Sequence, residues 1–169
     1  MEADRASERG RKRLNRRPVN KGSFQSGSSG TQNRFIEDLR QPLHVGDAGS
    51  RGGNEIQVRF DKVGSNLHRV WDSQTIERYT TDERELLEDL KGILIPDSTA
   101  EWVEGTPEEW ATESLQVTKK ASCVPETQTV IQSVTALGDS YFLMALPLIQ
   151  MQLAKAEVRV GWMLNEMFK

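Results

Sequence analysis

Two histidine-containing segments limit the possible folds of this chain more strongly than any other pattern in its sequence. The chain has only two histidines: His44 ends the segment Gln-Pro-Leu-His, and His68 begins His-Arg-Val-Trp-Asp, which closes with Asp72. If the second segment is helical, His68 and Asp72 stand at i and i+4 and leave the same helix face. Two imidazoles and one carboxylate with an open fourth position are the ligands of a catalytic zinc. The alternative is two unrelated surface histidines beside an ordinary i, i+4 pair.

Several motifs surround these residues in a fixed order. They are, in chain order, 35–47 (FIEDLRQPLHVGD), 51–58 (RGGNEIQV), 66–73 (NLHRVWDS), 110–114 (WATES) and 152–156 (QLAKA). In order and approximate spacing they resemble the trinuclear-zinc, single-strand-specific nuclease family (the S-one and P-one nucleases). That family shares its all-helical fold with zinc-dependent phospholipase C. The resemblance covers about residues 34 to 168, the C-terminal part of a family domain.

The resemblance implies both a fold and an activity. The implied fold is all-α, a zinc phospholipase C/nuclease-like helical domain with one small β-hairpin, its N-terminal half replaced by a disordered arm. The implied activity is that of a zinc-dependent phosphodiesterase, a single-strand-specific endonuclease for DNA and RNA with 3′-nucleotidase-type activity and 5′-phosphorylated products. We expect single-stranded nucleic acid or nucleotides as partners, no membrane, and a monomer. Family resemblance implies a secreted or periplasmic location, although the chain as written begins without an apolar signal segment.

The resemblance also assigns roles to individual residues. His44, His68 and Asp72 correspond to the three ligands of one zinc site, so one complete site is expected of the three zinc ions in the family. Asp38 corresponds to the carboxylate that bridges the other two zinc ions, which makes it a further metal ligand and the candidate catalytic residue. The histidine expected four residues before Asp38 is Arg34 here, and a guanidinium cannot ligate zinc. We therefore expect this chain by itself to be much slower than an intact relative.

Two residues are candidate substrate contacts. Asn54 follows Gly52 and Gly53 in a turn that resembles the family's turn beside the cleft, where close backbone approach favours glycine. A purely structural hairpin turn explains the same residues equally well. Trp71 has a ring that can stack on an unpaired base, but it stands between metal ligands on a predicted helix, where packing in the core is the favoured alternative.

Residues 1 to 31 differ in composition from the rest of the chain. They carry eight basic and three acidic residues, a net charge of +5, so the remainder of a chain with net charge -3 carries -8. The Gly/Ser-rich stretch 22–30 is typical of a flexible linker. We therefore predict a disordered basic arm over 1–31 and a partial zinc nuclease domain over 32–169. The arm either contacts nucleic-acid phosphates without sequence preference or is a solvated tail.

Local patterns predict the remaining elements. We expect helices at 33–39, after an Asn66 cap, over 82–94 and from the Thr-Pro-Glu-Glu segment at 106, with a strand within 55–60. The helix from 106 should present Trp110 and Leu115 to the core. From Pro125 the pattern predicts helix, with a break near Gly138 and a final helix from about Pro147. No run approaches the ~20 apolar residues that span a bilayer.

Three functions remain open from the sequence. The chain is a zinc-dependent endonuclease, whole or partial; a truncated, non-catalytic remnant that binds a single zinc; or a module that binds nucleic acid through the basic arm. The identity of residue 34 and the absence of an N-terminal family half argue against full catalytic competence of this chain alone.

Overall fold

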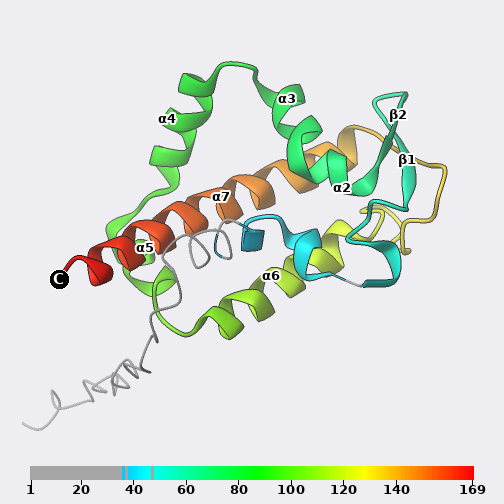
Figure 1. Cartoon of the computed structure of the whole chain (residues 1–169). Coiled ribbons are helices and arrows are strands. Elements are labelled where there is room, and N and C mark those ends of the chain that lie inside the picture. The colour runs from blue at the N-terminus through cyan, green and yellow to red at the C-terminus, as the bar shows by residue number, and fades with distance from the viewer. Residues whose placement is uncertain (1–35, 37, 47) are drawn as a thin grey trace, which may run out of the picture.

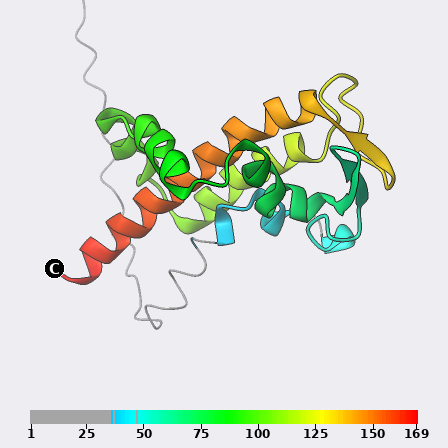
Figure 2. The same cartoon turned by 90° about the horizontal axis from the view of Figure 1, so that it is seen from above.

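The computed structural model describes residues 36, 38–46 and 48–169 of the chain. The described part is mainly helical, as predicted, and is built on two helices that lie side by side, α6 (Pro107–Ala121) and α7 (Asp139–Met167) (Figure 1). A small sheet lies where α7 begins, and two shorter helices lie nearer its C-terminal end (Figure 2). The predicted arm at 1–31 lies outside the described residues.

The remaining elements connect these parts. In chain order they are η1 (Pro42–Val45), η2 (Ala48–Ser50), β1 (Gln57–Phe60), β2 (Val63–Asn66), α2 (Leu67–Arg69), the π-helical turn η3 (Val70–Gln74), α3 (Thr75–Tyr79), α4 (Glu83–Ile93), α5 (Pro96–Trp102) and β3 (Thr135–Leu137). Residues 36, 38 and 39 are helical, which is the described part of the helix predicted at 33–39.

The predicted hairpin is present and has one strand more than expected. β1 and β2 pair antiparallel, and the turn between them consists of Asp61 and Lys62, whose φ angles are 50° and 69°. Two positive φ angles are typical of the turn type whose twist matches that of the flanking strands. β3 joins the other edge of β1 in a parallel pairing, which gives the strand order β2-β1-β3.

The segment after Pro125 was predicted to be helical, and this prediction was wrong. Cys123 and Val130 form an isolated β-bridge, and the chain then enters β3. This segment is rich in threonine and valine, whose branched side chains favour extended backbone. The free edge of β1 supplies the backbone hydrogen-bond partners that make the extended form stable.

The prediction that the last helix begins near Pro147 was also wrong. α7 begins at Asp139, with Gly138 as its N-cap, and runs through Pro147 without interruption. Proline removes one backbone hydrogen bond inside a helix and leaves the carbonyl four residues earlier without its donor. Here Pro147 is exposed, and that earlier residue, Leu143, is 68% exposed. Water can therefore solvate the free carbonyl.

α6 begins as its sequence predicts. Thr106 and Glu109 form a reciprocal capping box, and Pro107 occupies the first turn. Trp110 is buried and donates its indole N–H to the Glu104 carbonyl at 2.9 Å. Leu115, which was also expected in the core, is instead 38% exposed. The buried face of α6 is therefore narrower than predicted.

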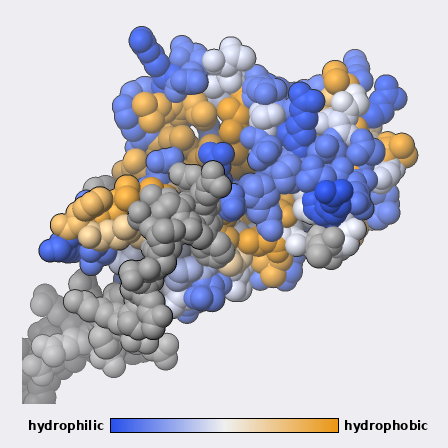
Figure 3. Space-filling model, in the orientation of Figure 1, coloured by the Kyte–Doolittle hydropathy of each residue, from blue (hydrophilic) through white to orange (hydrophobic). Residues whose placement is uncertain are grey.

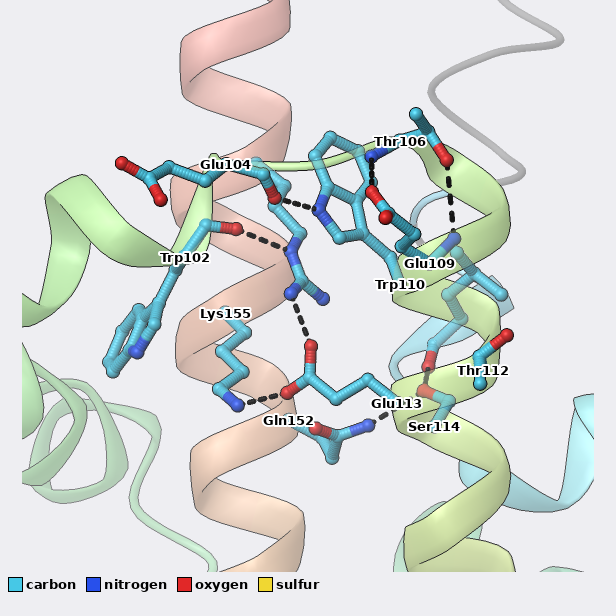
Figure 4. A network of polar contacts seen from close by, with 12 residues as sticks. Trp102, Glu104, Thr106, Glu109, Trp110, Thr112, Glu113, Ser114, Gln152 and Lys155 are labelled. Carbon is cyan, nitrogen blue, oxygen red and sulfur yellow. Dashed lines mark hydrogen bonds and ion pairs between the residues drawn. The ribbon is translucent and has the colours of Figure 1, made fainter. Parts of the chain in front are cut away.

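An ion-pair network joins α6 to α7 (Figure 4). The Glu113 carboxylate accepts hydrogen bonds from Lys155 and from Arg159, the latter at 2.5 Å, and Arg159 also donates to the Trp102 carbonyl at 2.9 Å. Burial raises the pKa of the Glu113 carboxyl, but the hydrogen bonds from the two cations outweigh it and hold that pKa below its usual value. The carboxylate therefore stays ionised between two partly desolvated cations.

The main core cluster and α4 differ in how deeply their apolar side chains are buried. The main core cluster joins η1, the sheet, α2, η3 and the first half of α7. α4 has no fully buried residue: Leu87 is 51% exposed and Leu94 is 39% exposed. Figure 3 shows hydrophobic surface around α4 and α7. None of the helices in the described ranges combines the length and apolar character needed to cross a membrane.

Candidate metal centre

α6 holds the segment that carries His44. The Ser114 hydroxyl donates to the Leu39 carbonyl at 2.6 Å, and the Thr118 hydroxyl donates to the Pro42 carbonyl. All four of these residues are buried. Buried carbonyls need donors, so these contacts fix the backbone of η1 against α6, and His44 projects from a segment that is held on both sides of Gln41.

The second segment is a helix interrupted by a π turn. The Asn66 side chain accepts from the Arg69 amide at 2.8 Å, which confirms Asn66 as the N-cap of the helix that carries His68. Within η3 the backbone bonding shifts by one residue, and the Thr75 hydroxyl donates to the Val70 carbonyl at 2.7 Å. π turns of this kind recur at functional sites. Here the turn contains Asp72.

The structure brings His44, His68 and Asp72 together. One ligand atom of each residue lies within 4.8 Å of the other two. The two imidazole rings stack with centroids 5.0 Å apart, and His68 Nε2 lies 3.6 Å from Asp72 Oδ2. Two ligands of one tetrahedral zinc, each at about 2.1 Å, lie about 3.4 Å apart. The His68–Asp72 separation of 3.6 Å is close to this value.

Backbone carbonyls favour the same tautomer at both histidines. His44 Nδ1 lies 3.1 Å from the Asp38 carbonyl oxygen, and His68 Nδ1 lies 2.9 Å from the Gly52 carbonyl oxygen. A carbonyl only accepts, so Nδ1 carries a proton in each ring, and in the neutral imidazole Nε2 keeps the lone pair. Metal-binding histidines are usually oriented in this way. The donor set therefore fits a zinc ion with nitrogen and oxygen ligands.

The turn that presents the Gly52 carbonyl requires glycine. Gly52 and Gly53 have φ angles of 63° and 82°, in the left-handed region. A Cβ at Gly52 would lie 2.8 Å from the Leu43 carbonyl oxygen, closer than real contacts allow. The Gly53 carbonyl accepts from the His68 amide at 3.3 Å. The turn therefore lies tightly between η1 and the His68 helix, where any side chain at Gly52 would force them apart.

Asp38 lies beside the cluster but outside it. Its side chain is 69% exposed, and its Oδ1 is 3.9 Å from His44 Nδ1, so that its closest contact with the cluster is made by its backbone carbonyl. Arg34 lies outside the described residues. Within the described ranges, His44, His68 and Asp72 form the one group of three side chains placed to hold a metal.

The two candidate substrate contacts lie in different surroundings. Asn54 is exposed on the glycine turn, where its amide donates to the Arg51 carbonyl at 2.9 Å. Trp71 is only 3% exposed, and its indole N–H donates to the Tyr141 hydroxyl at 2.7 Å. Tyr141 in turn donates to the Ala121 carbonyl. Trp71 therefore packs in the core and does not contact substrate, because stacking on a base requires an exposed ring face.

Comparison with known proteins identifies the family. The model of the S1/P1 nuclease family matches residues 32–169. The chain belongs to this family.

Individual relatives agree with this assignment. Endonuclease 4 of Arabidopsis thaliana is 35% identical over 150 residues, which cover 79% of this chain and 48% of the relative. Endonuclease 2 of the same plant is 33% identical over 147 residues, with 79% and 49% covered. Nuclease P1 of Penicillium citrinum is 28% identical over 147 residues, with 78% and 54% covered. The chain thus spans about half the length of the relatives it matches.

One residue of this S1/P1 family site, Gln41, was not predicted from the sequence. Gln41 is 4% exposed, and its Nε2 donates to Asp72 Oδ1 at 3.2 Å and to the His68 carbonyl at 3.3 Å. Its Oε1 accepts from the Leu43 amide at 3.4 Å. A glutamine in a motif gives no sign of such contacts, because its partners lie far away along the chain.

Proposed function

We propose that this chain supplies a zinc site to a phosphodiesterase that cleaves single-stranded DNA and RNA, with 3′-nucleotidase-type activity and 5′-phosphorylated products. The observation that carries the proposal is the convergence of His44, His68 and Asp72, with both Nε2 atoms free, in a chain of the S1/P1 nuclease family. The matched relatives bear the names endonuclease and nuclease, which supports a nucleic-acid substrate.

Each residue of the site has a distinct task in this proposal. A zinc ion bound here would act as a Lewis acid on a phosphoryl or leaving oxygen. His44, His68 and Asp72 hold it, and the exposed fractions of His44 and Asp72, 34% and 48%, leave a side open for phosphate. The exposed carboxylate of Asp38 is the candidate ligand for further metal and the candidate catalytic group. Asn54, exposed on the adjoining turn, is the candidate contact with substrate.

A second candidate is a protein that binds one zinc without efficient catalysis. One observation favours it: the described residues contain one three-ligand group. Paired metals generate the nucleophile in two-metal phosphodiesterases, so one ion leaves that task incomplete. We therefore expect zinc-dependent cleavage that is slow in this chain alone and faster when the remainder of a family domain is supplied.

The experiment combines metal analysis with cleavage. The purified chain should bind about one zinc and cut a single-stranded oligonucleotide faster than the same sequence in a duplex, leaving 5′-phosphates. His44→Ala should lose both properties, whereas Glu77→Gln, which changes an exposed carboxylate on α3, should keep them. Cleavage that survives exhaustive chelation in His44→Ala would overturn the proposal, as would wild-type protein that binds no zinc.

Salt dependence separates the site from the basic arm. If the arm is the main contact, affinity for a single strand should fall steeply with salt and be the same in wild type and His44→Ala, because phosphate contacts release counterions. If the metal centre is the contact, affinity should depend on zinc and on His44. Fluorescence anisotropy with a labelled oligonucleotide at several salt concentrations distinguishes these results.

A further inference from the structure

We propose that Gln41 is a positioning residue of the metal centre: its buried amide holds the Asp72 carboxylate in the orientation that binds metal. The inference rests on the proposed zinc site and adds to it a residue that touches none of the reacting atoms. It follows from the contacts of the amide, from its burial, and from its place in the chain relative to His44.

Gln41 contacts both ligand-bearing segments at once. Its Nε2 has two hydrogens, and they are directed to Asp72 Oδ1 and to the His68 carbonyl, at 3.2 Å and 3.3 Å. Its Oε1 accepts from the Leu43 amide at the start of η1, the short helix that carries His44. All three bonds agree with one orientation of the amide. A single side chain therefore links the segment of His44 to the helix of His68 and Asp72.

The bond to Asp72 restricts a side chain that is otherwise free to turn. The Asp72 side chain is 48% exposed, and rotation about its last bond would exchange its two oxygens or turn both away. Because Gln41 binds Oδ1, the second oxygen, Oδ2, faces His68 Nε2 at 3.6 Å. A carboxylate held in this way loses less freedom when it binds a cation.

The chemistry of the side chain suits this task. An amide donates to the carboxylate without neutralising its charge, so that Asp72 keeps its negative charge for the metal. A lysine or arginine in the same place would form an ion pair and add a like charge beside zinc. Gln41 is 4% exposed, so water replaces its amide poorly. The backbone on either side of Gln41 is held by the hydrogen bonds from α6 to the Leu39 and Pro42 carbonyls.

Gln152 provides a matched control for the test. It is also 4% exposed, and its Nε2 donates at 2.8 Å to the Ser114 hydroxyl, which still has its own hydrogen for the Leu39 carbonyl when Gln152 is replaced. Gln41→Met and Gln152→Met each replace a buried amide with an apolar chain of similar length. Both variants should lower the unfolding temperature of the zinc-free protein. Only Gln41→Met should weaken zinc binding, by about 10- to 100-fold, the usual effect of removing an outer partner of a metal ligand.

Zinc affinity is measured by competition with a chromophoric chelator, and the ligand geometry by the absorption of bound Co²⁺. The Co²⁺ spectrum of Gln41→Met should change, and that of Gln152→Met should match wild type. Equal zinc affinity in wild type and Gln41→Met would overturn the inference. Wild-type protein that binds no zinc would instead overturn the proposed function, so the two failures are distinguishable.

Two further variants keep the test decisive if Gln41→Met folds poorly. Gln41→Asn retains an amide but is one methylene shorter, so it cannot reach Asp72 and should also lose affinity. In an Asp72→Ala background, Gln41→Asn should have no further effect on zinc affinity, because its target is gone. A loss of equal size in both backgrounds would show that Gln41 does not act through Asp72.

Discussion

The imidazole rings of His44 and His68 stack with their centroids 5.0 Å apart and their planes inclined by 23°. Each ring directs Nδ1 to a backbone carbonyl, one from Asp38 and one from Gly52. The two carbonyls therefore favour the same tautomer in two histidines from different segments, with each neutral ring directing its lone pair from Nε2. Together with Asp72 this is a preorganised set of ligands, and its consequences for stability can be measured.

Zinc should stabilise the folded protein through these ligands. A ligand that binds only the native state adds about 2.7 kcal/mol when its concentration is 100 times its dissociation constant. Thermal unfolding with and without zinc should show an upward shift for wild type and for Glu77→Gln, and none for His68→Ala. An equal shift in His68→Ala would mean that zinc binds elsewhere in the chain.

Gly52→Ala should damage both the fold and the site. The new Cβ would lie 2.8 Å from the Leu43 carbonyl oxygen, at a φ of 63°. We expect a loss of about 1–3 kcal/mol in the free energy of unfolding, with weaker zinc binding because the Gly52 carbonyl orients His68. Gly92→Ala is the control: a Cβ at Gly92 in α4 meets nothing within 4 Å, so urea unfolding should show unchanged or higher stability. Equal effects of the two substitutions would contradict the assigned role of the turn.

Tyr141→Phe should destabilise the core. The Tyr141 hydroxyl accepts from the Trp71 indole and donates to the Ala121 carbonyl, and all three residues are buried. Its removal leaves one buried donor and one buried acceptor unpaired, a cost of about 1–3 kcal/mol in the free energy of unfolding. Tyr79→Phe, at a more exposed tyrosine that donates to Asp89, should cost much less. Urea unfolding followed by tryptophan fluorescence measures both, and equal losses would contradict this prediction.

Glu113→Gln should destabilise the protein in a pH-dependent way. The substitution leaves buried Arg159 without its carboxylate, and we expect a loss of about 1.5–3 kcal/mol at pH 7. The folded-state pKa of Glu113 lies below the ordinary value of 4.5, so the carboxylate stabilises the fold above pH 4.5 and this contribution is lost as pH falls through the folded-state pKa. The difference between the unfolding free energies of wild type and variant should therefore shrink in acid. A difference that is constant with pH would show that the ion pair is not its source.

The sequence by itself predicted those features that depend on neighbouring residues. His68 and Asp72 are four residues apart on a helix, so their approach follows from helix geometry alone. The Asn66 cap, the helix start at Thr106 and a strand within residues 55–60 are likewise short-range patterns, and all three are present. The family motifs also identified His44 as a ligand. Its position beside His68 does not follow from any pattern of neighbouring residues.

Tertiary structure decided the features whose partners are distant in sequence. β3 is extended because β1 offers it an edge, and α7 continues through Pro147 at an exposed position, where the residue that loses its hydrogen-bond donor, Leu143, is also exposed. Trp71 is likewise a core residue rather than a substrate contact, because its indole N–H donates to the Tyr141 hydroxyl on α7. Gln41 becomes part of the metal centre for the same reason. A glutamine can donate to many partners, and only the packing of η1 against the His68 helix places the Asp72 carboxylate within its reach.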